Sequence, residues 1–152
     1  MKKYLYILLL PFVLGSCIKD GLDNYPVFDE AEITDFDLEY RYVQTNNYGV
    51  EQLAVITLNT TVNINEGSAT IVVDAVVPGA TDSFPESERS KVSLSDIVAY
   101  TKLSPAAKIE PVNGAPILGA PGDFSTSREY KVTAADGKTV KNWTITVQSL
   151  TL

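Results

Sequence analysis

Arg128-Glu-Tyr-Lys-Val-Thr-Ala-Ala-Asp-Gly-Lys-Thr-Val-Lys-Asn-Trp-Thr-Ile-Thr-Val147 is the stretch that decides the fold of this 152-residue chain. Apolar residues occupy every second position from Tyr130 to Ala134 and again from Trp143 to Val147, the period of a half-buried strand. Asp136-Gly137 lies between the two runs and readily adopts the positive φ of a tight turn. The stretch therefore predicts a β-hairpin near the C-terminus.

The aromatic residues of three predicted strands are expected in the core. Trp143 is in phase with the apolar face of the hairpin, and Tyr130 is expected to be its cross-strand neighbour. Tyr40 and Tyr42 share the apolar face of an earlier strand, Phe36–Tyr42, whose other face is acidic and polar. That alternation predicts a strand with one face in water.

The rest of the chain offers further short strands. A run rich in β-branched residues predicts one strand over Leu53–Ile64, and the most apolar run predicts a central strand over Ala69–Val77. Thr101–Pro105 and Lys108–Pro111 contain proline, which edge strands tolerate, so both are expected at sheet edges. With the hairpin, the chain predicts an all-β, immunoglobulin-like β-sandwich of about seven strands.

Three segments are expected to connect these strands. Ala80–Ser90 reads as the longest loop, and Asn113–Ser127 as an irregular connection rich in glycine and proline. In Lys91–Tyr100 a helical turn capped by Ser93 or Ser95 competes with a strand, and we expect a crossing turn.

The N-terminus has the pattern of a secretion signal. Met1-Lys2-Lys3 is basic, and Tyr4–Leu14 is apolar but too short to span a bilayer. Leu14-Gly15-Ser16-Cys17 resembles the bacterial lipobox, which implies that Cys17 is acylated and becomes the mature N-terminus. The alternative is an ordinary signal peptide followed by an incidental cysteine.

This pattern predicts the domain organisation of the chain. It also predicts that the protein binds a membrane through acylated Cys17. The predicted parts are a cleaved signal peptide over residues 1–16, a lipidated tether over 17–28 and the sandwich domain over 29–150. The Lys19-Asp20 pair resembles, in part, the export signal of surface lipoproteins of Bacteroidota. The outer membrane is the expected location, at the cell surface or on the periplasmic face.

Charge excludes some partners. The net charge is −7, and removing Lys2 and Lys3 with the leader takes the 12 basic residues to 10 against 19 acidic ones, or −9. So acidic a surface is repelled by nucleic acid and by anionic lipid, and we expect no nucleic-acid partner.

Five segments resemble a recurrent module of Bacteroidota proteins. They are Ser93–Val98, Leu103–Gly114, Asp123–Ser125, Tyr130–Lys138 and Trp143–Val147. In the same order, they are similar to the Ig-like module of Bacteroidota lipoproteins. The resemblance implies an outer-membrane lipoprotein with a β-sandwich, working beside polysaccharide-uptake machinery. It carries over no catalytic or binding residue.

The opening of the domain supports the same resemblance. Tyr25–Phe36 is similar to the opening of lipoproteins that carry a domain of carbohydrate metabolism after such a module. That second domain has no counterpart before Leu152, which weakens considerably the transfer of a glycan function to this chain.

The chain lacks the residues of common catalytic sites. It contains no histidine, and its one cysteine is Cys17. The lack of histidine excludes histidine-based catalysis, and acylation of Cys17 would exclude thiol-based catalysis. No reaction-class motif is present, so we expect a non-enzymatic protein without cofactor or metal. Asp82, Glu86 and Glu88 are the residues that could hold calcium, although ordinary solubilising acids are the simpler interpretation.

Two functions remain open. An accessory module that binds an extracellular glycan would use exposed aromatic rings, and Tyr48 in a turn and Tyr100 near a loop are the candidate ligand-binding residues. A structural, adhesin or protein-interaction subunit would instead present a flat apolar patch or an open sheet edge without a sugar-sized groove.

Overall fold

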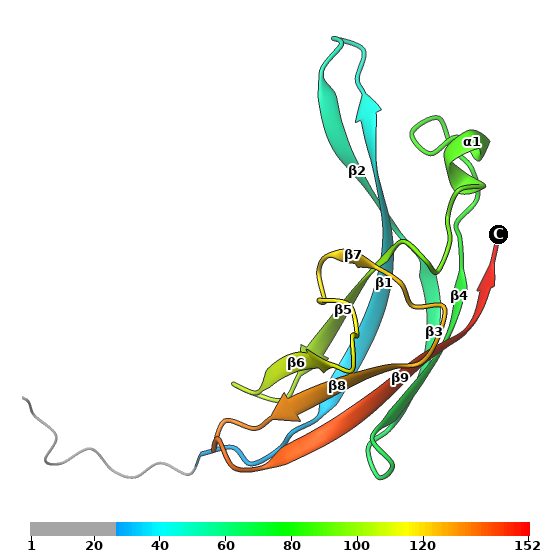
Figure 1. Ribbon diagram of the computed structural model, residues 1–152. Helices are drawn as coiled ribbons and strands as arrows, with labels where there is room; N and C mark the ends of the chain where they lie inside the picture. The colour runs from blue at the N-terminus through cyan, green and yellow to red at the C-terminus, as the bar shows by residue number, and fades with distance from the viewer. Residues whose placement is uncertain (1–26) are drawn as a thin grey trace, which may run out of the picture.

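The computed structural model describes residues 27–152, which form a sandwich of two β-sheets (Figure 1). The strands are β1 (Ile33–Thr45), β2 (Glu51–Thr57), β3 (Asn59–Asn65), β4 (Thr70–Val76), β5 (Ile97–Leu103), β6 (Lys108–Val112), β7 (Pro121–Gly122), β8 (Arg128–Thr133) and β9 (Val140–Thr151), and a short helix, α1, spans Glu86–Arg89. One sheet has the order β2-β1-β5-β7 and the other β3-β4-β9-β8-β6. The predicted all-β sandwich is confirmed.

The predicted C-terminal hairpin is present as β8 and β9. Tyr130 lies opposite Trp143, and both side chains are fully buried. The Trp143 indole N–H donates to the carbonyl oxygen of Ala31 at 3.0 Å, and the Tyr130 hydroxyl donates to that of Pro116 at 2.8 Å. Burial raises the pKa of Tyr130 to about 12. The hairpin thus ties the chain before β1 and the connection before β7 to one core.

The turn of this hairpin is longer than the two residues expected. Gly137 has a φ of +68°, and the Ala134 N–H donates to the Thr139 carbonyl at 2.9 Å, so the loop spans residues 134–139. The Asp136 carboxylate accepts hydrogen bonds from the backbone N–H groups of Lys138 and Thr139 and from the Thr139 hydroxyl, each at 2.8 Å. The two backbone bonds are the main cause that lowers the pKa of Asp136.

Asp136→Asn is expected to make the melting temperature, Tm, fall less steeply as the pH is lowered into the acidic range. Because the pKa of Asp136 is lower in the folded than in the unfolded chain, its stabilising effect is present above the unfolded pKa and disappears as the pH falls through the folded one. Below about pH 4, Tm of the parent should therefore fall more steeply than Tm of the variant. Circular dichroism melts across acidic pH measure this, with the exposed loop acid Asp82, as Asp82→Asn, for control. An equally steep fall of Tm with decreasing pH in the parent and in Asp136→Asn would contradict this prediction.

The single strand expected over Leu53–Ile64 is wrong, because the chain changes sheets at Leu58. The Leu58 N–H donates to the carbonyl oxygen of Leu38 at 2.9 Å, and the next residue starts β3 in the opposite sheet. Even-numbered residues from Ala54 to Ile64 face inward on both sides of this crossing. The phase of the alternation is unbroken, so the sequence pattern contains no mark of the crossing. This division and the two-residue β7 raise the strand number above seven.

The segment from Ala80 to Leu103 also differs from the prediction. The helical turn lies at α1, inside the expected loop, and Ser93–Ser95 precede β5. The isolated edge strand expected over Thr101–Pro105 is the end of β5, which pairs with β1 from Val98 to Leu103 and with β7 at Ile97 and Val98. Acidic residues in the first turn and Arg89 in the last favour the helix at α1. The predictions of a central β4 and of an edge strand at β6 are confirmed.

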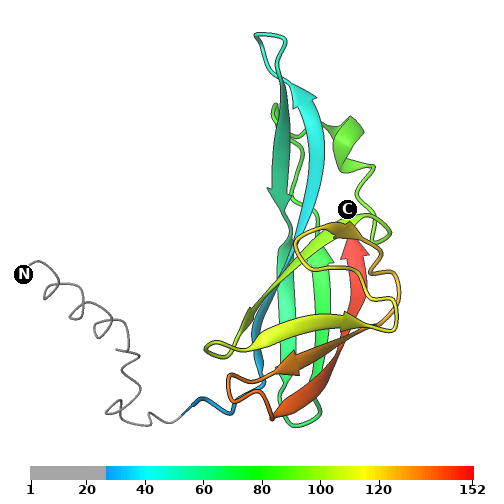
Figure 2. The ribbon, with the colours of Figure 1, turned by 60° about the vertical axis from the view of Figure 1, so that its left-hand side comes forward.

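β1 and β2 continue beyond the sandwich as a two-stranded arm (Figures 1 and 2). We define the arm as residues 40–56, because β5 pairs with β1 only up to Glu39. The inner face of the arm contains Tyr40 and Tyr42, whose rings stack with centroids 5.9 Å apart, and Phe84 lies 6.4 Å and 6.2 Å from these two rings. The segment with α1 therefore covers one face of the arm.

Candidate functional site

The structure does not bring the two candidate tyrosines together. Tyr48 lies at the tip of the arm and is 90% exposed. Tyr100 lies in β5, opposite Asp37 of β1, and not near a loop as the sequence suggested. The eight residues from Asp37 to Thr45 place the arm tip roughly 26 Å further along β1. The two rings therefore cannot contact one small ligand.

The Tyr100 ring is already engaged within the protein. The Arg41 guanidinium lies 5.5 Å from the ring centroid, and its Nη2 donates to the Tyr100 hydroxyl. Arg41 also pairs with Glu39 at 3.2 Å and donates to the Gly119 carbonyl at 3.5 Å. These contacts fix the connection before β7 against the sheet, and Arg41 covers one face of the Tyr100 ring.

Two of the three acids named for calcium, Glu86 and Glu88, form ion pairs within the protein. Glu86 pairs with Arg89 at 3.2 Å, and Glu88 pairs with Lys91 at 2.6 Å. Within residues 27–152 no group of three histidine, cysteine or acidic side chains is placed to hold a metal ion. Cys17 lies outside the described residues. No helix of the described part is long and apolar enough to cross a membrane.

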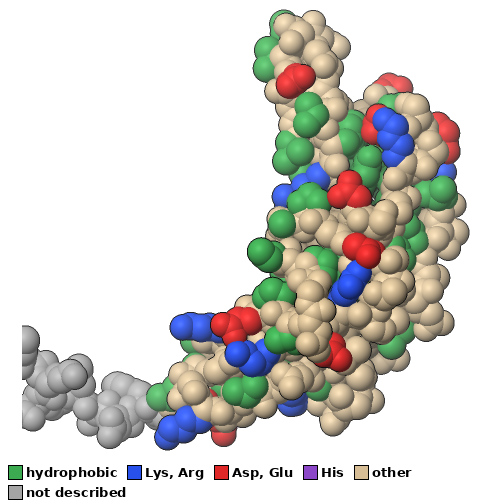
Figure 3. All heavy atoms as spheres, in the orientation of Figure 1, with side chains coloured by type: hydrophobic (Ala, Val, Ile, Leu, Met, Phe, Trp, Pro, Cys, Tyr) green, Lys and Arg blue, Asp and Glu red, His purple; other side chains and the backbone are tan. Residues whose placement is uncertain are grey.

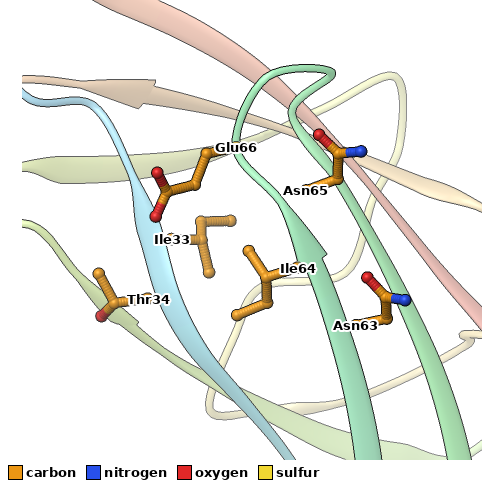
Figure 4. A pocket seen from close by; sticks show the side chains of 6 residues that line it. All are labelled: Ile33, Thr34, Asn63, Ile64, Asn65 and Glu66. Atoms are coloured by element: carbon orange, nitrogen blue, oxygen red, sulfur yellow. The ribbon is translucent and has the colours of Figure 1, made fainter.

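A shallow hollow lies between the start of β1 and the end of β3 (Figure 4). The Lys141 ammonium lies beside it, donating to the Glu32 carboxylate and, at 3.1 Å, to the Glu66 carbonyl. Ile33, Thr34, Asn63, Ile64, Asn65 and Glu66 line it. None of these six side chains is aromatic and only one is a carboxylate. The hollow therefore offers neither a stacking surface for a sugar nor a pair of acids for general acid–base chemistry.

The outer face of the arm exposes large apolar side chains. Val43 and Leu53 are cross-strand partners that are 63% and 59% exposed, and Val55, 47% exposed, lies opposite Arg41. We call Val43, Leu53 and Val55 the arm face. In Figure 3 hydrophobic side chains follow this side of the molecule from the arm downward. Contiguous exposed apolar groups of this kind mark interaction sites more often than isolated ones do.

The outer backbone edge of the arm is also unpaired. Leu58 N–H donates to Leu38 at one end of the β1–β2 ladder, and Asn46 N–H donates to Val50 at the other, both at 2.9 Å. Hydrogen-bonded pairs recur every second residue in an antiparallel ladder, so even-numbered residues of β2 bond to β1. The odd-numbered residues of β2 therefore direct their N–H and C=O groups away from β1. They are Glu51, Leu53, Val55 and Thr57.

The other three sheet edges carry features that discourage strand pairing. β7 is two residues long and starts with proline, and β6 contains Pro111 between charged and apolar positions. β3 exposes only polar side chains, namely Asn59, Thr61, Asn63 and Asn65. Proline, shortness and polar side chains are the usual protection of an edge strand. Among the described strands, β2 alone combines an open edge with exposed Leu and Val and has neither proline nor lysine.

The sequence analysis missed this surface. Leu53, Ala54, Val55 and Ile56 form a continuous apolar run, which is typical of a strand buried on both faces. In the structure only the even-numbered face is covered. The available signal was that the strand after the turn-rich segment 44–49 contains neither lysine nor proline. This signal indicates an unprotected edge only when β2 is known to lie at the edge of a sheet.

Comparison with known proteins places the chain in a family. A candidate secreted protein from Bacteroides fragilis has a TM-score of 0.75 and 36% sequence identity, covering 84% of this chain and 100% of that one. A candidate glycoside hydrolase from Bacteroides thetaiotaomicron has a TM-score of 0.46 and 24% identity, covering 84% of this chain and 27% of that one. None of the curated proteins matches. Residues 33–146 match the family described as DUF5018-related, and since this match runs from β1 into β9, the chain belongs to the DUF5018-related family.

Proposed function

We propose that this protein is a lipid-anchored, non-enzymatic module of the bacterial envelope that binds a protein partner through the edge of β2. The open, apolar edge of β2 carries the proposal. Main-chain hydrogen bonds to an added strand supply affinity, and the exposed side chains of the edge strand supply specificity. The edge has the features by which a protein-interaction subunit differs from a glycan-binding module.

The proposed location is supported by the N-terminus and by a relative. The leader and the lipobox-like sequence before Cys17 favour export and acylation. The B. fragilis relative, described as a candidate secreted protein, supports an exported protein. The chain enters the sandwich at the end opposite the arm tip (Figure 2), and the ten residues from Cys17 to Val27 reach at most about 35 Å. An anchor at Cys17 would therefore attach at the end of the sandwich away from the arm.

Glycan binding is the second candidate, and the exposed ring of Tyr48 favours it. A single tyrosine at an arm tip provides one stacking surface, whereas Tyr100, the other expected aromatic, is held by Arg41. Affinity electrophoresis of parent and Tyr48→Ala across a panel of polysaccharides separates the two candidates. Retardation of the parent that Tyr48→Ala abolishes would replace the protein partner by a glycan.

Photo-crosslinking tests the protein-partner proposal directly. The full chain, with p-benzoylphenylalanine in place of Leu53 or Val55, is expressed in a Bacteroides host and irradiated. We expect a discrete protein adduct from both positions, because an added strand on β2 contacts both side chains. Thr61 on the polar edge of β3 is the matched control and should give no adduct. Equal adducts from Thr61 and Leu53, or none from Leu53, would overturn the proposal.

A further inference from the structure

We infer that the strand added to β2 is β2 of a second copy of this chain, in antiparallel pairing about a two-fold axis at Ala54. This inference rests on the proposed function and names the partner. The two four-stranded sheets would become one continuous sheet, with two arms side by side at its centre. In an isologous contact of this kind, the same patch of both copies must be complementary to itself.

The backbone of β2 satisfies this condition. With the axis at Ala54, each odd-numbered residue faces an odd-numbered residue of the second copy, so Leu53 lies opposite Val55 and Glu51 opposite Thr57. These are the residues whose N–H and C=O groups point away from β1. All four therefore form hydrogen-bonded pairs, giving about eight hydrogen bonds between the copies.

The side chains favour the same register. On the outer face, Leu53 of each copy meets Val55 of the other, and Val43 continues the apolar surface on both sides. Moving the axis to Leu53 would set Glu51 against Val55, and moving it to Val55 would set Leu53 against Thr57. Of these three registers, the Ala54 register alone gives both Leu53 and Val55 an apolar partner, and such cross-strand pairs stabilise a sheet.

Charge does not oppose this pairing. β2 carries one charged side chain, Glu51, and the pairing sets it opposite an uncharged threonine. On the neighbouring strand, Glu39 and Arg41 neutralise each other within one copy at 3.2 Å. No like charges face each other across the contact, an arrangement that would otherwise destabilise an antiparallel pair.

The arm also gives the second copy room. The Ala54 register sets Thr57 of one copy opposite Glu51 of the other, so the two arms overlap side by side and the two sandwiches lie at opposite ends of the joined arms, because the arm projects from one end of the sandwich (Figures 1 and 2). The inner face of each arm stays covered by the segment with Phe84. The pair therefore adds to the sheet without displacing any contact described here.

Sedimentation of residues 18–152 tests the inference. The B. fragilis relative, whose whole chain aligns to 84% of this one, folds as this domain alone, which justifies the soluble form. We expect a concentration-dependent dimer of the parent at tens of micromolar. Leu53→Lys and Val55→Pro should be monomeric, the latter because proline removes an N–H that faces the second copy and not β1. Asn63→Lys, on the β3 edge, should dimerise like the parent.

A cysteine variant tests the register. Across the axis the two Ala54 Cα atoms are about 4.5 Å apart, so Ala54→Cys should give a disulfide-linked dimer under mild oxidation. Gln52→Cys should not, because its two copies lie roughly 14 Å apart along the strands. Circular dichroism melts check that every variant is folded.

The outcomes separate the inference from the proposed function. A parent that stays monomeric, or a dimer that Leu53→Lys leaves intact, would overturn the second copy as partner. If Leu53 then crosslinks in the cell to a protein whose mass differs from that of this chain, the proposed function is supported and the inference of a second copy is not. If the adduct has twice the mass of the chain, both are supported.

Discussion

Replacing Trp143 with alanine is expected to lower the free energy of unfolding by about 3–5 kcal/mol. Trp143 is fully buried between the sheets, opposite Tyr130, and its indole N–H bonds to Ala31 before β1. The substitution removes the largest side chain of the core and leaves a cavity, and it leaves the Ala31 carbonyl without this donor. Because domains of this size are stable by about 5–15 kcal/mol, the variant should be close to unfolding.

Urea unfolding of residues 18–152 measures the effect of Trp143→Ala. The unfolding is monitored by circular dichroism of the backbone, a signal that does not require the tryptophan. Trp143→Phe is the matched variant, since it keeps an aromatic ring in the core but loses the N–H donor. We expect its loss to be smaller than that of Trp143→Ala. A change below about 1 kcal/mol for Trp143→Ala would contradict the central place of the C-terminal hairpin in the core.

Cys17→Ser is expected to abolish incorporation of fatty acid into this protein. The proposed anchor is a thioether on the Cys17 sulfur, and the serine hydroxyl does not replace a thiolate nucleophile in forming it. Stable anchoring needs more than one acyl chain, which the triacylated cysteine of a lipoprotein would supply. The variant should therefore be lost from the outer-membrane fraction of cells.

Labelling of cells with radioactive palmitate, followed by isolation of the full chain, measures this loss. Ser16→Ala is the control, because it keeps a small residue before the cysteine and should be labelled like the parent. Intact mass of the parent should correspond to a chain that starts at Cys17 with lipid attached. Equal labelling of parent and Cys17→Ser would refute the proposed anchor.

Local patterns of the sequence predicted the elements whose two faces differ. β1 and the β8–β9 hairpin have one apolar and one polar face, so a period of two was enough to predict the strands and the burial of Tyr130 and Trp143. The prolines identified β6 as an edge strand. These features depend on neighbouring residues alone and therefore do not require knowledge of the partner strands.

Such local patterns did not predict the candidate site. Tyr48 was expected at a turn and lies at one, whereas Tyr100 was expected near a loop and is instead held on β5 by Arg41, 59 residues earlier in the chain. The exposure of Leu53 and Val55 depends on β2 lying at a sheet edge. Neither fact follows from the residues next to them.

The sequence by itself determined an all-β chain, its C-terminal hairpin and the composition that lacks histidine. Alternation along a strand encodes the strands and the hairpin, because it determines which side chains avoid water. Tertiary structure alone decided where the chain changes sheets at Leu58, which strands lie at the edges and which apolar face of the arm stays uncovered. The physical reason is that strand pairing joins residues far apart in sequence, and alternation specifies a buried face without specifying what buries it.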